Sequence, residues 1–195
     1  GMAATSVLEP ICLLYRQTGD PRLLQFAQSI VAAWERPTGA RIVSSIASTG
    51  STFKTANAKA YEMVSNLVGL IELHRITGDR QYLDTALRAW TDIRENRLYV
   101  SGTISTGEHF LDDHVLPAGG PDHMGEGCAT VTWMQMNWQL LRTTGEARFG
   151  DEIERTLYNH LLGAENPETG GVCYYMPLDG RKGYGKGISC CGSSI

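Results

Sequence analysis

The chain has 195 residues, of which 42% are hydrophobic, so it is long enough for about one domain with a core of its own. Its formal charge of −4 comes from 17 basic and 21 acidic residues that are mixed along the sequence. No run of Lys or Arg could follow a phosphate backbone or an anionic membrane, and no apolar stretch approaches the roughly 20 residues that span a bilayer. Nucleic acid and membranes are therefore not expected as partners.

The N-terminus leaves the localisation unknown. Gly1 precedes Met2, which is typical of a residue left by tag removal, and no basic segment followed by an apolar one comes after it. We expect that the native N-terminus is missing, so a cytoplasmic and a secreted protein are both compatible with the sequence.

A short motif, Arg-x-Thr-Gly followed by an acidic residue, recurs at 16–20, 75–79 and 142–146. Apolar residues at helical spacing precede and follow each copy, and the glycine can adopt the left-handed conformation that ends a helix. Each copy therefore predicts a helical hairpin. The three hairpins are expected near residues 5–35, 57–96 and 128–163.

The intervals between the repeated motifs are longer than the roughly 33–47 residues of tetratricopeptide, HEAT or armadillo repeats, which disfavours a simple peptide-binding solenoid. The extra length falls at 37–56 and 97–127, in segments rich in Gly, Ser, Thr, Pro and Asp. Long loops at one end of a helical scaffold are where a site would be built. The sequence predicts an all-α fold, an incomplete α/α toroid of the six-hairpin type found in many glycosidases.

The pattern changes after the third hairpin. Residues 171–178 have a strand-like composition with a proline near the end, and residues 180–195 form a Gly-rich tail. We therefore expect a short β segment near the C-terminus, within one partial toroid domain that spans residues 1–195.

The chain has five cysteines, an odd number, which does not suggest a paired disulfide framework. Glu126, Cys128, Cys190 and Cys191 offer three thiols and one carboxylate, a plausible tetrahedral ligand set for zinc. The adjacent cysteines would point in opposite directions from a strand, so both could bind one ion only from a turn. Residue content alone leaves three alternatives open: a metal site, buried free thiols, and a disulfide between the adjacent cysteines.

Four segments carry a resemblance to a known family. They are Ser105-Thr106-Gly107-Glu108-His109-Phe110, Glu126-Gly127-Cys128-Ala129-Thr130-Val131, Glu154-Arg155-Thr156-Leu157-Tyr158-Asn159 and Cys190-Cys191-Gly192. In this order they resemble glycoside hydrolase family 127, which includes β-L-arabinofuranosidases. Family members also have earlier toroid helices and later β-sandwich domains, so the chain resembles the central and later part of a catalytic toroid.

This resemblance implies a retaining glycoside hydrolase that acts on L-arabinofuranosides or a related sugar. It implies that zinc is held by Glu126, Cys128, Cys190 and Cys191, that Cys190 is the nucleophile, and that Glu108 is the acid/base. A zinc-bound cysteine is held as the thiolate, the form that can attack an anomeric carbon.

Three further residues are expected to bind the substrate, by resemblance to sugar-contacting positions of the family. Glu154 could equally be a solvated helix residue, and Tyr174 could equally be a core aromatic residue. The family often has a histidine near Asn57, and this departure leaves the identity of the sugar open.

Two other hypotheses compete with an active enzyme. In one, the chain is a non-catalytic helical-repeat interaction module whose zinc or disulfide only pins the tail; Glu108 favours the enzyme, because a structural site needs no carboxylate in a separate loop. In the other, the partial ring is inactive alone and self-associates through the apolar helix faces that it exposes.

Overall fold

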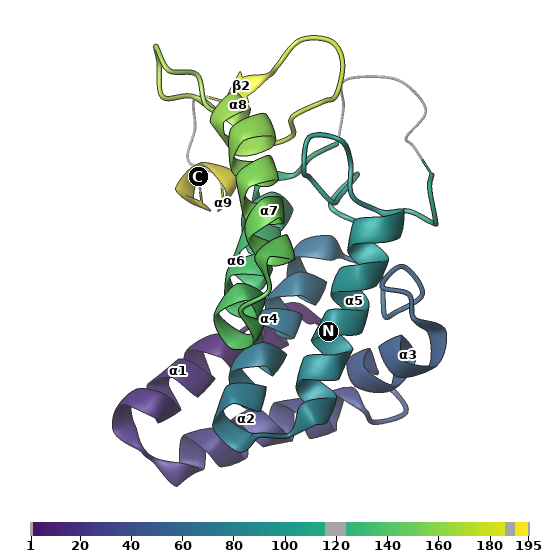
Figure 1. Ribbon diagram of the computed structural model, residues 1–195, viewed down its shortest axis with the longest axis vertical. Coiled ribbons are helices and arrows are strands. Elements are labelled where there is room, and N and C mark those ends of the chain that lie inside the picture. The colour runs from purple at the N-terminus through teal and green to yellow at the C-terminus, as the bar shows by residue number, and fades with distance from the viewer. Residues whose placement is uncertain (1, 116–123, 186–189, 195) are drawn as a thin grey trace.

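The structure, a computed structural model, describes residues 2–115, 124–185 and 190–194. These residues are mostly helical, and a small two-stranded sheet lies near the C-terminus. Figure 1 shows the N-terminal helices at one end of the molecule and α6, α7 and α9 at the other, with α4 between them. The predicted all-α class with a short β segment is thus confirmed.

Three pairs of consecutive helices form hairpins in the described part of the chain. In each pair the first helix ends at a glycine with positive φ, from 69° at Gly19 to 75° at Gly145, a conformation that side chains disfavour. Asp20 and Asp79 then cap the second helix of their pairs by accepting a hydrogen bond from a backbone N–H two residues later. The pairs are α1 (Leu8–Thr18) with α2 (Pro21–Trp34), α4 (Ala60–Thr77) with α5 (Arg80–Asn96), and α6 (Gly127–Thr144) with α7 (Ala147–Thr156).

The connecting segments contain more structure than the sequence indicated. Helix α3 lies inside the first expected loop, and the third hairpin continues beyond α7 as a π-helical turn, η2, and a short helix, α8. The expected strand is limited to β1, which pairs antiparallel with β2 in the Gly-rich tail. The bounds are η1 Met2–Thr5, α3 Ile42–Thr49, η2 Leu157–Leu161, α8 Leu162–Ala164, β1 Val172–Cys173, β2 Tyr184–Gly185 and α9 Cys190–Ser194. Residues 186–189 and 195 of the expected tail lie outside the described residues.

The first helices of the three pairs pack side by side, with α4 between α1 and α6. Gly69 on α4 allows a close approach, because a Cβ there would lie 2.7 Å from Leu8 on α1. On the other side, Trp90 of α5 stacks on Trp133 of α6 and meets the edge of Phe149 of α7. One continuous hydrophobic core therefore joins all three hairpins. No helix in the described residues is long and apolar enough to cross a bilayer.

The repeated arginines of the motif bind side chains near the turns. Arg16 and Arg75 place an Nη1 3.1 and 2.6 Å from the two carboxylate oxygens of Glu72, whose side chain is fully buried. In the third copy Arg142 donates to Gln139 instead. Arg16 therefore links the first hairpin to the second, whereas Arg75 and Arg142 bind within their own helices.

Arg97, directly after α5, holds the two long loops in place. Its guanidinium is 1% exposed and pairs with Asp92, with Nη2 to Oδ1 at 2.8 Å. It also donates to Ser51 in the first loop and to Asp113 in the second. Burial alone would raise the pKa of Asp92, but hydrogen bonds from Arg97 and Thr52 outweigh burial and hold the pKa below its usual value.

We expect Asp92→Asn to lower the free energy of unfolding by about 3 kcal/mol or more, because the substitution leaves the buried Arg97 charge without its main partner. Since the folded pKa of Asp92 is lowered, its contribution is complete above the unfolded pKa of about 4 and is lost as pH falls through the folded value. The acid-side slope of stability against pH should therefore be smaller in the variant. Denaturant titrations at several pH values measure both effects.

Asp84→Asn is the matched control, because Asp84 forms an ion pair with Arg80 in which both side chains are more than half exposed. It should change stability by less than about 0.5 kcal/mol. Equal losses in the two variants would contradict the structural role of the buried pair.

Candidate active site and metal centre

Three segments, 105–110, 124–127 and 174–176, meet beside the first turns of α4 and α6. The N–H of Gly125 donates to the carbonyl of Ser105 at 2.9 Å, and the N–H of Gly127 donates to the carbonyl of Tyr174 at 3.1 Å. The N–H of Met176 donates to the carbonyl of Gly125 at 3.2 Å. These hydrogen bonds bring together parts of the chain that are far apart in sequence.

The four predicted metal ligands form a cluster at this junction. Glu126 lies directly before α6, Cys128 lies in its first turn, and α9 brings Cys190 and Cys191 to the same place. One ligand atom from each of the four lies within 4.8 Å of the others. Sulfur atoms about 2.3 Å from a tetrahedral zinc would be roughly 3.8 Å apart, so little movement is needed to enclose an ion.

The adjacent cysteines do not lie in an open turn, as the sequence suggested, but begin the short helix α9. None of the five cysteines forms a disulfide among the described residues. Cys191 is fully buried and its sulfur lies 3.4 Å from that of Cys128, whereas Cys190 is exposed. The only exposed thiol of the cluster is therefore the one that the resemblance assigns to attack.

The residues present fit a metal ion. The carboxylate of Glu126 is 3% exposed, and its Oε2 is buried without a hydrogen-bond partner among the described residues. Such an orphaned oxygen is costly unless a ligand satisfies it. Three sulfurs beside one carboxylate oxygen are a donor set that suits a tetrahedral soft or borderline cation.

Within the cluster, burial and neighbouring groups shift the pKa values of the acidic side chains in opposite directions. Burial, followed by the charges of Glu108 and Cys191, raises the pKa of Glu126 to about 7. A hydrogen bond from the thiol of Cys128 lowers the pKa of Cys191 to about 6, and backbone N–H groups at the start of α6 add to this effect. Cys128 correspondingly keeps its proton, with a raised pKa. The cluster thus holds one thiolate in a buried, acid-rich setting.

Glu108 lies beside the cluster in a left-handed conformation, with φ of 65°. Its Oε2 is 2.9 Å from the ammonium of Lys59, and its Oε1 accepts hydrogen bonds from the hydroxyls of Tyr174 and Tyr175 at 2.7 and 3.3 Å. The ammonium of Lys59, followed by the hydroxyl of Tyr174, holds the pKa of Glu108 below its usual value. In this arrangement Glu108 is a carboxylate.

The hydroxyl of Tyr174 connects Glu108 to Cys190. Besides its hydrogen bond to Glu108, it lies 3.8 Å from the sulfur of Cys190. The carboxyl oxygen and the sulfur are therefore no farther apart than the sum of these two distances, about 6.5 Å. This limit includes the roughly 5–5.5 Å separation of the two catalytic groups in retaining glycosidases.

The other two expected substrate contacts are placed differently. Asn57 is exposed and lies two residues before Lys59, at the edge of a pocket of about 590 Å³ whose lining includes Glu62. Glu154 is exposed on α7 and lines a shallow surface pocket with Tyr158 and Asn159. The structure brings Tyr174 to the site and Asn57 to its neighbourhood, whereas no contact among the described residues joins Glu154 to the cluster.

Several site residues were not identified from the sequence. Lys59 and Tyr175 both bind Glu108, but neither belongs to a recognisable motif. Tyr61 lies in the first turn of α4, where burial, followed by the neighbouring thiol groups of Cys128 and Cys190, raises the pKa of its hydroxyl. A β-bridge between Lys59 and His109 is what places Lys59 opposite the acid loop, and no local pattern predicts such a pairing.

His160 packs against the turn at Gly125, next to the cluster. The π-helical turn η2 carries it, and its Nδ1 lies 3.1 Å from the hydroxyl of Ser101 while its Nε2 lies 3.4 Å from the carbonyl of Gly125. The imidazole is fully buried, and burial lowers its pKa to about 4, so the ring is neutral. Gly125 has φ of 70°, and a Cβ there would lie 2.5 Å from the ring.

The sequence matches the family model described as the β-L-arabinofuranosidase GH127 catalytic domain, over residues 5–195. A curated relative, the non-reducing end β-L-arabinofuranosidase of Bifidobacterium longum, is 29% identical over 134 residues. This alignment covers 67% of the chain and 18% of the relative.

Solved structures show the same fold. A GH127 β-arabinofuranosidase superposes with a TM-score of 0.75 and 27% identity, over 94% of this chain and 30% of that one. A GH127 β-L-arabinofuranosidase of Geobacillus stearothermophilus T6 gives a TM-score of 0.70 and 17% identity, over 86% and 30% of the two chains. The predicted toroid architecture is confirmed, and the chain spans less than a third of these relatives.

We expect Gly125→Ala to weaken the metal centre. The new methyl group would meet His160 and the carbonyl of Met176, at a positive φ that side chains disfavour. Stability should fall by about 1–3 kcal/mol, and the start of α6 should shift, so metal retained per chain should fall as well. Thermal unfolding and elemental analysis of purified protein measure the two effects.

Gly150→Ala is the control, because this glycine lies within α7 and its added Cβ would make only an ordinary contact at 3.9 Å with Leu141. It should leave metal content unchanged and could raise stability by up to about 1 kcal/mol. Normal metal content in Gly125→Ala would show that the left-handed turn is not needed to shape the cluster.

Proposed function

Because this chain belongs to glycoside hydrolase family 127, we propose that it carries the catalytic centre of a retaining glycosidase that acts on L-arabinofuranosides or a related sugar. The observation that supports this most directly is the alignment of Glu108, the Tyr174 hydroxyl and Cys190 beside a metal-ligand cluster. A carboxyl group and a thiol within about 6.5 Å of one another are what a double displacement at an anomeric carbon requires.

In this proposal zinc is held by Glu126, Cys128, Cys190 and Cys191. When bound, it would keep the thiols as thiolates and neutralise the charge that the buried cluster collects. The orphaned oxygen of Glu126 and the three sulfurs support a borderline-soft cation over magnesium or calcium, which prefer oxygen ligands.

The chemistry is divided between two side chains. Glu108 protonates the leaving oxygen while the Cys190 sulfur attacks the anomeric carbon; the carbon–oxygen bond breaks and a carbon–sulfur bond forms. Glu108, now a carboxylate, removes a proton from water, which attacks the same carbon and releases Cys190 as the thiolate. Two inversions leave the configuration of the sugar unchanged.

The hydrogen bonds of Glu108 favour its carboxylate form, which serves the second step. The first step needs the protonated form, and the pKa of Glu108 must therefore rise when a sugar binds. Exclusion of water by the substrate would raise it, because desolvation disfavours the charged carboxylate. Tyr174, whose pKa is raised by its hydrogen bond to Glu108, keeps its proton and can orient the carboxyl group in both states.

The placement of α9 supports a second candidate function. Cys191 is fully buried against the start of α6, so a metal ion there would pin the C-terminal segment to the third hairpin. A purely structural zinc in an interaction module would need this contact, but not the exposed Cys190 or the paired Glu108.

The catalytic roles can be tested in the full-length protein that contains this chain. With an aryl β-L-arabinofuranoside as substrate, Cys190→Ala and Glu108→Gln should each lower kcat/KM by at least about 10²-fold. Glu108→Gln should keep its zinc, because Glu108 is not a ligand. Steady-state kinetics and elemental analysis on the same preparations measure both.

Cys12→Ala is the control for loss of a thiol, because Cys12 is buried in α1 and lies outside the metal-ligand group. It should keep its activity and its metal. If Cys190→Ala and Glu108→Gln both kept the activity of the parent, these catalytic roles would be excluded. If the parent had no activity and lost thermal stability when zinc was removed, a purely structural zinc would be favoured.

Lys59→Met should shift the pH dependence of this activity. It removes the interaction that lowers the pKa of Glu108 most, so that pKa should rise. A general acid works while it is protonated, and activity should therefore persist to higher pH. The alkaline limb of kcat/KM should move upward, which a pH–rate profile would show.

Lys54→Met is the control, because Lys54 is exposed and its ammonium makes no ion pair among the described residues. Its profile should match that of the parent. An alkaline limb that moves downward in Lys59→Met would contradict the assignment of Glu108 as the acid.

A further inference from the structure

The two oxygens of the Glu108 carboxylate have different kinds of partner. Its Oε1 accepts hydrogen bonds from the hydroxyls of Tyr174 and Tyr175 at 2.7 and 3.3 Å. Its Oε2 lies 2.9 Å from the ammonium of Lys59. All three partners act as donors, so this arrangement suits the ionised carboxylate.

The protonated acid needs a different arrangement. In a displacement the leaving oxygen departs on the side of the sugar opposite the nucleophile, and Tyr174 joins Oε1 of Glu108 to the sulfur of Cys190. The proton for the leaving oxygen is therefore needed on Oε2. A protonated Oε2 is a donor, and the ammonium of Lys59 has donors only. Lys59 must therefore leave Oε2 before Glu108 can act as an acid.

Glu62 is placed to receive this ammonium. It lies in the first turn of α4, three residues after Lys59, and its Oε1 is 3.9 Å from Nζ of Lys59. The Glu62 side chain is 15% exposed, and Lys59 is its only charged partner among the described residues. A movement of about 1 Å would bring the two groups within hydrogen-bond distance, and the flexible stem of a lysine allows it.

No other carboxylate near Lys59 offers the same position. The remaining titratable groups that face Glu108, Lys59 or Glu62 come from α4, the acid loop, the segment after β1, and the first residues of α6 and α9. They are Tyr61, His109, Tyr174, Tyr175, Glu126 and Cys190. Of these six only Glu126 is a carboxylate, and it belongs to the metal-ligand cluster.

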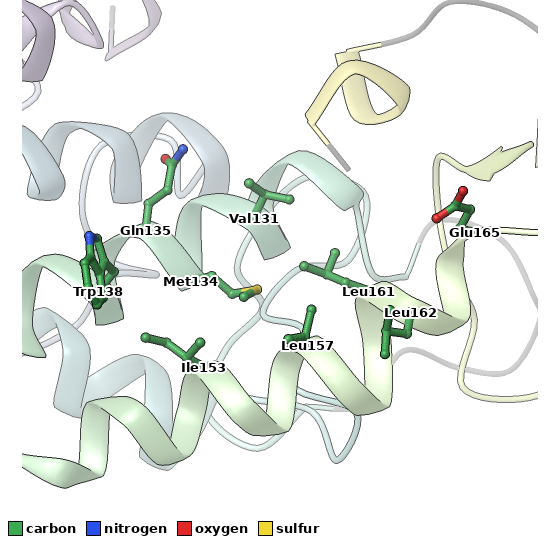
Figure 2. A pocket seen from close by; sticks show the side chains of 9 residues that line it. All are labelled: Val131, Met134, Gln135, Trp138, Ile153, Leu157, Leu161, Leu162 and Glu165. Atoms are coloured by element: carbon green, nitrogen blue, oxygen red, sulfur yellow. The ribbon is translucent and has the colours of Figure 1, made fainter. Parts of the chain in front are cut away.

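The cavity that adjoins the acid also contains Glu62. The pocket of about 590 Å³ is lined by Glu62 and Asn57, so a sugar bound there would exclude water from the groups around Lys59. The apolar groove between α6 and the α7–α8 helix, shown in Figure 2, has no such connection. Within the described residues, no hydrogen bond or ion pair joins the lining of the groove to Lys59, Glu62 or Glu108.

We infer that Glu62 is a positioning residue that takes over the ammonium of Lys59 whenever Glu108 is protonated. Glu108 gives its proton to the leaving oxygen, and Lys59 then returns to Oε2 of the carboxylate. In the second step Glu108 takes a proton from the attacking water, and Lys59 moves to Glu62 again. The ammonium keeps its own protons throughout. This inference rests on the proposed role of Glu108.

A crystal structure of the full-length Glu108→Gln protein tests the exchange without any need for activity. The new amide is neutral, like the protonated acid. Its oxygen should accept from the two tyrosine hydroxyls, which turns its NH₂ group towards Lys59. The distance from Nζ of Lys59 to the Glu62 carboxylate should then fall from 3.9 Å to roughly 2.7–3.2 Å. An ammonium that stays within hydrogen-bond distance of residue 108 would overturn the inference.

Glu62→Gln should hold Lys59 on Glu108 and so oppose protonation of the acid. With an alkyl β-L-arabinofuranoside, whose leaving group needs a proton, kcat at neutral pH should fall by about tenfold or more. The alkaline limb of kcat should move to lower pH, and metal content should stay the same. Glu168→Gln is the matched control, because Glu168 is exposed and makes no ion pair among the described residues. Its pH–rate profile should match that of the parent.

The double variant Lys59→Met, Glu62→Gln separates the exchange from a direct effect of the Glu62 charge. Without the ammonium Glu62 has nothing to receive, so its replacement should move the alkaline limb much less than in the parent. Equal shifts in the two backgrounds, or no shift in the parent, would overturn the inference and leave the role of Glu108 intact. Full activity of Glu108→Gln would overturn the proposed function, and the inference with it.

Discussion

The site depends on the backbone of Gly125. Its N–H binds the carbonyl of Ser105, its carbonyl accepts from Met176, and its left-handed turn leaves no room for a side chain. These contacts fix three segments at once: the loop of Glu108, the ligand pair at the start of α6, and the segment of Tyr174. If Gly125 adopted another conformation, Glu108, the ligand pair and Tyr174 would no longer lie together. No single helix or strand carries more than two of these site residues.

The cluster combines opposing electrostatic effects in one small volume. Burial pushes Glu126 towards its neutral form, whereas the hydrogen bonds at the start of α6 push Cys191 towards its thiolate. A cation held there would relieve both, since it would stabilise carboxylate and thiolate together and satisfy the orphaned oxygen of Glu126. The fold thus collects four potential ligands in one buried cluster, and binding of a metal ion there would be coupled to folding.

The sequence predicts those features of the fold that are formed by neighbouring residues and that repeat along the chain. The Arg-x-Thr-Gly motif indicates the hairpins because the turn glycine and the following acidic cap are adjacent in the chain. Helix α3 was missed because its sequence is rich in Ser and Thr, which favour helix interiors only weakly, and the burial of Ile42, Val43 and Ile46 stabilises it instead. Lys59 and His160 were missed because their partners are distant in sequence. The family resemblance pointed to Glu108 and to the four clustered ligands, whose side chains lie close together, whereas Glu154 stays a prediction on the exposed side of α7.

The repeat also explains why the site lies at one end of the stack. Because the three hairpins repeat, α1, α4 and α6 run in the same direction, and their N-termini gather at one end. Lys59 precedes α4 and Glu126 precedes α6, so the site lies where the positive ends of these helices converge. Positive helix ends stabilise carboxylates and thiolates, which are the groups collected there. The repeat therefore concentrates, at the end where α4 and α6 begin, the positive potential that suits an acidic, thiol-rich centre.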